Sequence, residues 1–485
     1  MPDTRVLIVV FDALRPEFLT QDLMPNLYAF ANRGVWYRNS HSTFFTETRV
    51  NQSVVVTGCM PQRHGIVANK FYVPALSADG VLNTGDDVAL EEAFHRADGR
   101  LLDMPTLGER LARHGLKFAS LSAGTPGGGR LINHSAKTNG TWRFAMRRPE
   151  AAEPTNAHAR IVERIGALPQ YSLPAKAWIT WAVNAYLEVV EPEAKPHAML
   201  LWLCEPDETF HYHGIGSPQS LEAIRHVDGE FGRILAHHAD AIAAGRLQVI
   251  AMSDHGQISL VGEALDLAAQ LERAGFRASR KPGPDVDLVV VPGSAAGIWN
   301  IGGDADLTER CANWLREQTW AGPMFTRSGM PGTLRHADVC LEHPRAPDIA
   351  MVFRSDDNHN AHRRQGETVH DAPYPVGGGC HGGLSRYELH NVLTLGGTKL
   401  KDRTVLDVPA GNVDITPTVL TLLGLPVPAE FDGRPLREAM HGGPDPASID
   451  WRDDILGSSN TSGPRTYLSV SDLGHTRYLN RGWVA

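Results

Sequence analysis

Short apolar runs alternate with segments of helical periodicity along most of the chain. The runs Val6–Phe11 (VLIVVF), Ala198–Cys204 (AMLLWLC) and Leu247–Met252 (LQVIAM) have the length and composition of strands that are buried on both faces. The segments Pro25–Arg33 and Ser217–Ala236 have the apolar spacing of helices, and the second opens with a serine and a proline, a typical helix start. Because strands alternate with helices, we expect an α/β fold with a mostly parallel central sheet flanked by helices.

Two segments are ambiguous by pattern alone. Ser53–Thr57 (SVVVT) is apolar and fits a strand as well as it fits a helix. Gly124–Gly129 (GTPGGG) resembles a phosphate-binding loop, but it lacks the GK[ST] ending of such loops. We expect a plain turn at the second segment.

The distribution of these elements predicts a core with one insertion. We expect an α/β catalytic core formed by residues 1–275 and 380–440, interrupted by a small cap at residues 276–379. The cap has strands of its own and a helix at Ala305–Glu317. Residues 441–485 contain more aromatic side chains than a disordered tail, so we expect them to pack on the core or on a partner subunit of a homo-oligomer.

Composition restricts the class of protein. The 485 residues carry a formal net charge of −9, which argues against a nucleic-acid duplex as partner. No apolar run approaches the roughly 20 residues of a membrane span, and the first strand is too short for a secretion signal. Five cysteines without a CxxC pair fit a reducing compartment, so we expect a cytoplasmic protein without membrane contact.

Carboxylates and imidazoles follow several of the expected strands or lie in a glycine-rich turn. Strand ends are where open α/β sheets place their sites. Three carboxylates and three imidazoles suffice for two divalent metal ions with open positions for a substrate. Nitrogen and oxygen ligands without a thiolate favour Zn²⁺, followed by Mn²⁺ or Fe. The residues are Asp12 (in FDALRP), Asp207 and His211 (in EPDETFH), Asp254 and His255 (in AMSDHG), and His381 (in GGGCHGG).

A hydroxyl-rich segment between the first strand and VVVTG contains the candidate nucleophile. If a helix begins near Thr48, its amide groups and dipole would stabilise an alkoxide and a phosphoryl oxygen. A bound divalent ion would lower the pKa of the hydroxyl further. Thr46 lies in the same segment, and these considerations leave both threonines open.

Seven motifs occur along the chain, in the order FDALRP, TETRVN, VTGCMPQRHGI, EPDETFH, SDHG, CHGGLSRYELH and DITPTVLTLLGLP. In order and spacing the chain resembles the alkaline phosphatase superfamily, in particular its nucleotide pyrophosphatase/phosphodiesterase branch. In that branch a Thr or Ser lies three residues before an Asn, which lies six residues before the Thr of a TG pair. The matching residues here are Thr48, Asn51 and Thr57.

The resemblance implies an alkaline-phosphatase-like core and assigns roles residue by residue. Thr48 would attack phosphorus and form a covalent phospho-enzyme, and this favours Thr48 over Thr46. Asn51 and the backbone amide of Arg49 would hold a non-bridging oxygen. One metal ion would be bound by Asp12, Asp254, His255 and Thr48, and the other by Asp207, His211 and His381.

Arg49 departs from the pattern of nucleotide-cleaving relatives, which usually have an aromatic residue directly after the nucleophile. An arginine there predicts either recognition of a second anionic group on the substrate or a structural ion pair at the helix start. His359, His362 and His370 precede His381 and lie either in a solvated loop or in contact with the substrate or a metal ion.

Cys59–Arg63 (CMPQR) fits the CxPxR pattern that sulfatases convert to formylglycine. In sulfatases the cysteine precedes the TG pair and takes the nucleophile position, whereas Cys59 follows it. We interpret Cys59 as a packing residue.

Taken with the resemblance, the sequence predicts a metal-dependent hydrolase of phosphate diesters that acts through a phospho-threonine. The alternatives are C–P bond hydrolysis like that of phosphonoacetate hydrolase and hydrolysis of nucleotide pyrophosphates. The substrate is expected to be a small phosphate ester or phosphonate. A binding protein without activity would be expected to lack a ligand or the hydroxyl, and all seven positions are present here.

Overall fold

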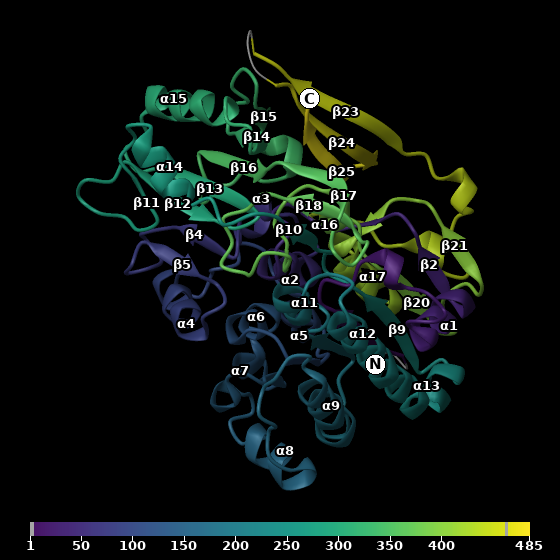
Figure 1. Ribbon diagram of the computed structural model, residues 1–485. Helices are drawn as coiled ribbons and strands as arrows, with labels where there is room; N and C mark the ends of the chain where they lie inside the picture. Colours follow the sequence, from purple (N-terminus) through teal and green to yellow (C-terminus); the bar gives the residue numbers. More distant parts are fainter. Residues whose placement is uncertain (1–3, 461–463) are drawn as a thin grey trace.

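The computed structural model describes residues 4–460 and 464–485 and is built on a central sheet of eight strands in the order β21-β2-β20-β9-β1-β8-β6-β7 (Figure 1). The neighbours from β9 to β7 all pair in parallel, while β20 runs antiparallel to β9 and β2. The expected α/β fold with a mostly parallel sheet is therefore confirmed. The strands are β1 (Arg5–Phe11), β2 (Val35–Tyr37), β6 (Phe118–Ser122), β7 (Arg143–Ala145), β8 (Ala198–Leu203), β9 (Leu247–Met252), β20 (Leu393–Gly396) and β21 (Thr404–Leu406).

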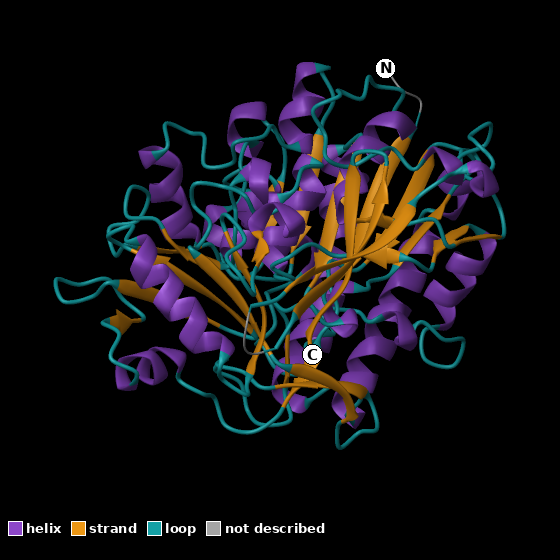
Figure 2. Cartoon of the chain, turned by 90° about the horizontal axis from the view of Figure 1, so that it is seen from above, coloured by secondary structure: helices purple, strands orange, loops and turns teal. Residues whose placement is uncertain are grey.

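Helices cover both faces of this sheet, as Figure 2 shows. Alternate residues of β1 enter two different hydrophobic cores, because successive side chains of a strand point to opposite faces. Both cores exclude water, which explains why the strand is a continuous apolar run. One core is closed by α1 (Pro25–Arg33), α9 (Lys176–Ala185) and α12 (Pro218–His237), and the other by α2 (Thr48–Thr57), α5 (Leu107–Arg113) and α17 (Ile415–Leu422).

The segment 276–379 forms a second sheet with the order β11-β12-β13-β16-β14-β15, covered by α15 (Ala305–Arg316). This sheet lies at one end of the molecule in Figure 1, away from α7 (Ala136–Asn139), α8 (Ala157–Ile165) and α9. Its last strands, β17 (Ser355–His359) and β18 (Gln365–Thr368), return to the core beside β10 (Ile258–Leu260) and β19 (Gly379–Cys380). The first strands are β11 (Ala278–Ser279), β12 (Leu288–Pro292), β13 (Ala295–Asn300), β14 (Ala321–Thr326), β15 (Leu334–Arg335) and β16 (Ile349–Phe353).

The C-terminal residues form a three-stranded antiparallel sheet of β23 (Arg452–Ser458), β24 (Thr466–Leu473) and β25 (Thr476–Val484). β24 and β25 pack beside β14. The hydroxyl of Tyr478, in β25, donates a hydrogen bond of 2.9 Å to the Asp414 carboxylate, so this sheet is tied to the core of the same chain. Residues 461–463 of this extension lie outside the described residues.

The two ambiguous segments are both helical. Ser53–Thr57 is the second half of α2, and the turn expected at Gly124–Gly129 is wrong, because α6 (Pro126–Ile132) begins there. A Cβ atom at Gly127 would lie 2.2 Å from the carbonyl oxygen of Thr84. The glycines therefore serve close packing of α6 rather than a turn.

Two expectations from composition concern cysteines and membrane spans. All five cysteines are buried, and none forms a disulfide. Within residues 4–460 and 464–485, no helix is both long enough and apolar enough to cross a membrane.

Candidate active site

The predicted metal ligands lie together at the carboxyl ends of adjacent parallel strands. Asp12 follows β1, Asp207 begins α11 (Asp207–His213) just beyond β8, and Asp254 lies two residues beyond β9. Because β1 pairs with both β8 and β9, the three loops open at the same edge of the sheet. One turn of α11 then places His211 on the same side as Asp207.

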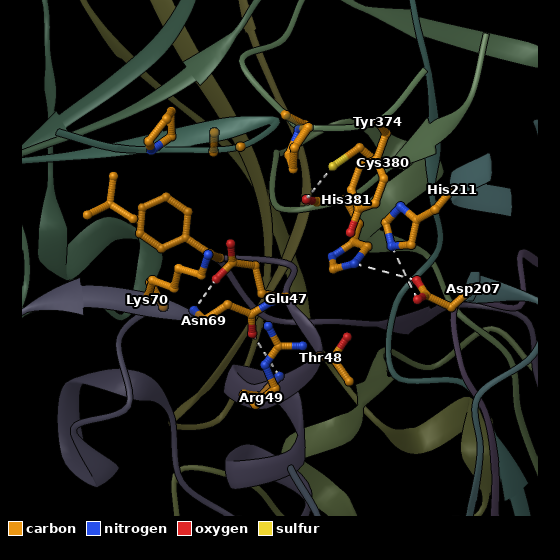
Figure 3. Close-up of a pocket in the computed structure, with 18 of the residues that line it drawn as sticks. Glu47, Thr48, Arg49, Asn69, Lys70, Asp207, His211, Tyr374, Cys380 and His381 are labelled. Atoms are coloured by element: carbon orange, nitrogen blue, oxygen red, sulfur yellow. Dashed lines mark hydrogen bonds and ion pairs between the residues drawn. The ribbon is translucent and has the colours of Figure 1, made fainter. Parts of the chain in front are cut away.

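Asp207, His211 and His381 form one group of ligand atoms. The Nε2 atom of His211 lies 3.2 Å from Asp207 Oδ2, and the Nε2 atom of His381 lies 3.5 Å from Asp207 Oδ1 (Figure 3). Each residue offers an atom within 4.8 Å of the others. Three ligands at these separations fit one divalent ion with space left for a substrate.

A second group surrounds the Nε2 atom of His255. This atom lies 3.1 Å from Asp254 Oδ2, 3.8 Å from Asp12 Oδ1 and 3.2 Å from Thr48 Oγ1. Asp207 also offers an atom within 4.8 Å of Asp12 and His255, so its carboxylate faces both groups.

The carboxylates of Asp12 and Asp254 are each satisfied on one oxygen only. Asp12 Oδ2 accepts from Trp202 Nε1 at 2.8 Å, and Asp254 Oδ1 accepts from the amide of Ala13 at 3.1 Å. Among the described residues, the other two oxygens are buried without a hydrogen-bond partner. Burial and the neighbouring carboxylates raise the pKa of Asp12. Two half-satisfied buried carboxylates beside an imidazole fit a divalent cation.

Backbone hydrogen bonds fix the tautomer of the three histidines. In each ring the Nδ1–H group donates to a carbonyl oxygen, which leaves the lone pair of Nε2 directed toward the carboxylates. Such outer bonds orient metal-binding histidines, so the rings have the tautomer that a metal ion requires. The bonds join His211 to Gly379 O (2.8 Å), His255 to Gly256 O (2.9 Å) and His381 to Thr46 O (2.9 Å).

The structure separates the two candidate nucleophiles. Thr48 is the first residue of α2 and lines a cavity of about 270 Å³ beside the ligands. Thr46 is fully buried, and its hydroxyl donates to Gly383 O and accepts from Gly382 N, both at 2.9 Å. Thr48 therefore has the hydroxyl that a substrate can reach, whereas Thr46 holds the loop that carries His381.

Asn51 is not brought into the cavity. Its Nδ2 group donates to Glu47 O at 3.1 Å, and its Oδ1 atom accepts from Thr43 N at 3.2 Å and Asn412 Nδ2 at 2.8 Å. Both ends of the carboxamide thus form bonds inside the protein, which makes Asn51 a residue that braces the start of α2. Because the Nδ2 group has a second N–H, the expectation that Asn51 holds a substrate oxygen stays a prediction.

Asn69 lies in the cavity wall instead and was missed in the sequence. Its side-chain Oδ1 atom accepts from the backbone amide of Arg49 at 3.0 Å, and its backbone amide donates to the Glu47 carboxylate. The amide of Arg49, expected to bind substrate, is therefore engaged with Asn69. The Nδ2 end of Asn69 is the donor left for a ligand. A polar residue directly after the apolar run Ile66–Ala68 is the same feature that indicated the metal ligands.

The other residues considered in the sequence lie elsewhere. Cys59 follows the C-terminal end of α2, one helix of 10 residues (about 15 Å) away from Thr48. Burial raises its pKa to about 12. His370 is buried with both ring nitrogens bonded to backbone, His362 lines a separate cavity, and His359 lies on the exposed strand β17. These positions are contrary to a sulfatase-like nucleophile and to further histidine ligands.

The profile of the type I phosphodiesterase / nucleotide pyrophosphatase family matches residues 6–368 of the chain. Human ectonucleotide pyrophosphatase/phosphodiesterase family member 1 is 25% identical over 255 residues, 52% of this chain and 23% of that protein. A venom phosphodiesterase of Macrovipera lebetinus is 23% identical over 293 residues, 59% of this chain and 30% of that protein. A bis(5'-adenosyl)-triphosphatase of Xenopus laevis is 38% identical over 68 residues, 14% of this chain and 15% of that protein.

The matched part thus spans less than a third of each of these relatives. The family profile, in contrast, covers most of the chain, including Asp12, Thr48, Asp207, His211 and Asp254. The resemblance in the sequence motifs is confirmed, and the chain belongs to the type I phosphodiesterase / nucleotide pyrophosphatase family.

Proposed function

We propose that the chain hydrolyses phosphate diesters to a monoester and an alcohol through a covalent phospho-threonine at Thr48, with the help of two divalent ions. One observation carries this proposal. The hydroxyl of Thr48 lies 3.2 Å from His255 Nε2, which also faces the unpaired oxygens of Asp12 and Asp254. A reactive hydroxyl, a cavity and two sets of ligands therefore meet at one place.

Zinc is the first candidate for both ions, because the donors are imidazole nitrogens and carboxylate oxygens without a thiolate. Bound divalent ions supply Lewis acidity, which lowers the pKa of a hydroxyl and offsets charge on phosphoryl oxygens. The two sets are Asp12, Asp254 and His255 with Thr48, and Asp207, His211 and His381.

The remaining groups position the phosphoryl group. Thr48 Oγ1 forms a bond to phosphorus while the bond from phosphorus to the first alkoxide breaks. The proton released by the Thr48 hydroxyl converts this alkoxide to the alcohol. Water then cleaves the phospho-threonine and releases the monoester. The N-terminus of α2 and the Nδ2 group of Asn69 favour the negative oxygens of the phosphoryl group.

Two other substrates are candidates at the same site. The names of the relatives favour a nucleotide pyrophosphate. Arg49, in the cavity wall directly after Thr48, favours a phosphonate with an acidic group, such as phosphonoacetate, whose C–P bond would be cleaved. A cytoplasmic location and a homo-oligomer remain predictions from the sequence.

A metal-reconstituted assay that compares four substrates tests the proposal. These are bis(p-nitrophenyl) phosphate, p-nitrophenyl phosphate, a nucleoside triphosphate and phosphonoacetate. We expect the diester to be cleaved with a higher kcat/KM than the monoester. A preference for the monoester of more than an order of magnitude would contradict diester hydrolysis, and the other two substrates decide between the alternatives.

A further inference from the structure

Two cationic side chains, Arg49 and Lys70, line the cavity beside Thr48 (Figure 3). In residues 4–460 and 464–485, neither side chain forms an ion pair with a carboxylate, and the buried Nε atom of Arg49 has no hydrogen-bond partner. An arginine nitrogen held out of water without an acceptor is costly, so an acceptor from a ligand would stabilise it.

The acidic residues of the same wall have partners of their own. Glu208 pairs with Arg147 at 2.7 Å, and the Glu47 carboxylate accepts from the amide of Asn69. Asp207 belongs to the metal ligands. Arg49 and Lys70 both interact electrostatically with Glu47, so two cations share one nearby carboxylate. The wall next to Thr48 therefore keeps an excess of positive charge for a ligand.

Four aromatic side chains line the rest of the cavity, and one of them, Tyr212, is 51% exposed. Phe45 and Trp299 are only 3% and 5% exposed. One face of the Tyr374 ring is covered by His211, with 3.9 Å between ring centroids and 15° between planes. The volume of about 270 Å³ lies at the small end of ligand cavities. This volume favours a compact organic group.

We propose that this cavity selects a small phosphate ester or phosphonate whose organic group carries a second anionic group, bound by Arg49 with Lys70 beside it. This inference rests on the proposed function, because phosphorus must lie at Thr48. Arg49 follows Thr48 directly and lines the same cavity, so one small ligand can reach both residues. A carboxylate and a second phosphoryl group share the required chemistry, since a guanidinium binds both in a bidentate manner.

Inhibition of bis(p-nitrophenyl) phosphate hydrolysis tests the inference at a fixed free zinc concentration. Phosphonoacetate supplies a carboxylate, methylenediphosphonate a second phosphoryl group, and phosphonoacetamide a neutral group of the same shape as the carboxylate. We expect at least one of the two anionic compounds to inhibit with a Ki at least tenfold below that of the amide. Equal Ki values for all three would overturn the inference.

Matched variants assign the effect to Arg49. In Arg49→Met we expect the preference for the anionic compound to fall to threefold or less, whereas Arg49→Lys should keep part of it. Arg38→Met, which removes an exposed arginine paired with Asp407 outside the cavity, should keep the full preference. A tenfold preference that persists in Arg49→Met would contradict the assignment.

A failure of the proposed function is distinguished by the diester itself. If the metal-loaded protein does not cleave it, diester hydrolysis is wrong, and binding of the same compounds is then measured by calorimetry. A tenfold preference for an anionic compound over the amide would still support the inference, and equal binding would overturn it.

Discussion

The imidazole of His381 donates its Nδ1–H to the carbonyl oxygen of Thr46, 2.9 Å away and two residues before Thr48. The Thr46 hydroxyl bonds in turn to Gly382 and Gly383, on the loop that carries His381. The segment with the candidate nucleophile and the loop with the most distant ligand in the sequence are thus joined by three hydrogen bonds. The position of Thr48 is coupled to the position of one ligand group.

Replacing Thr46 by valine should weaken zinc binding, because the hydroxyl that holds the 382–383 backbone is lost. Leaving these buried groups unpaired costs about 1–3 kcal/mol of folding stability. We expect at least a tenfold loss in zinc affinity for one ion, measured by competition with a chelator, and partial recovery in Thr46→Ser. The matched control is Thr394→Val, which removes one buried hydrogen bond to Ala251 O and should leave zinc affinity unchanged. Equal zinc affinity in Thr46→Val and wild type would contradict the coupling.

Thr48→Ala should abolish diester hydrolysis, because the attacking oxygen is removed. We expect kcat to fall by about 10³-fold or more, while Thr48→Ser keeps measurable activity through its hydroxyl. Zinc content, measured by atomic emission on the same preparations, should stay near that of wild type because six protein ligands remain. Substantial turnover in Thr48→Ala would show that another group attacks phosphorus.

Asn69 and Asn51 should respond differently to substitution by alanine. Asn69→Ala removes a donor in the cavity wall, and kcat should fall by about 10²–10³-fold. Asn51→Ala removes a buried brace, so we expect its main effect in urea unfolding, about 1–3 kcal/mol. Steady-state kinetics and urea titrations of both variants check this. The reverse pattern would support Asn51 as the residue that holds a substrate oxygen.

Zinc should stabilise the folded protein, since it satisfies the unpaired oxygens of Asp12 and Asp254. Asp254→Asn removes one of two neighbouring buried charges while its Oδ1 atom can still accept from Ala13. We therefore expect Asp254→Asn to melt higher than wild type in a chelator and lower in saturating zinc. Differential scanning calorimetry of wild type and Asp254→Asn in both buffers measures this reversal in the order of the two melting temperatures. If Asp254→Asn melts lower in both, the two carboxylates do not repel each other in the metal-free protein.

Buried His64 should make the protein less stable in mild acid. Burial lowers its pKa from 6.5 to about 3, so below pH 6.5 the unfolded chain binds a proton that the folded chain does not. Its contribution to stability is therefore lost as the pH falls through this range, by about 1 kcal/mol between pH 6.5 and 5.5. In His64→Asn the loss over this interval should be smaller by that amount, measured by urea unfolding of the chelated protein. An unchanged pH dependence would contradict it.

Local sequence pattern was enough to predict the fold class and the candidate ligand residues. Buried parallel strands appear in the sequence as continuous apolar runs. Asp12, Asp207 and Asp254 follow such runs, and the ends of these strands form the edge of the sheet where the site lies. The spacing of the family motifs indicated Thr48, and its place at the first residue of α2 agrees with the helix start considered there.

Which neighbours of Thr48 face the cavity depends on how distant segments pack together. Asn51, three residues away in sequence, turns into the protein, while Asn69 arrives from the loop before β4 (Lys70–Tyr72). The glycines of α6 suggest a turn in the sequence, and their role becomes clear only from the close approach of the Thr84 backbone. Sequence patterns report burial along one segment, whereas the lining of a cavity depends on how segments distant in sequence pack together. For the same reason the sequence left Arg49 open between a structural ion pair and anion recognition, and only the packing shows that no carboxylate among the described residues pairs with it.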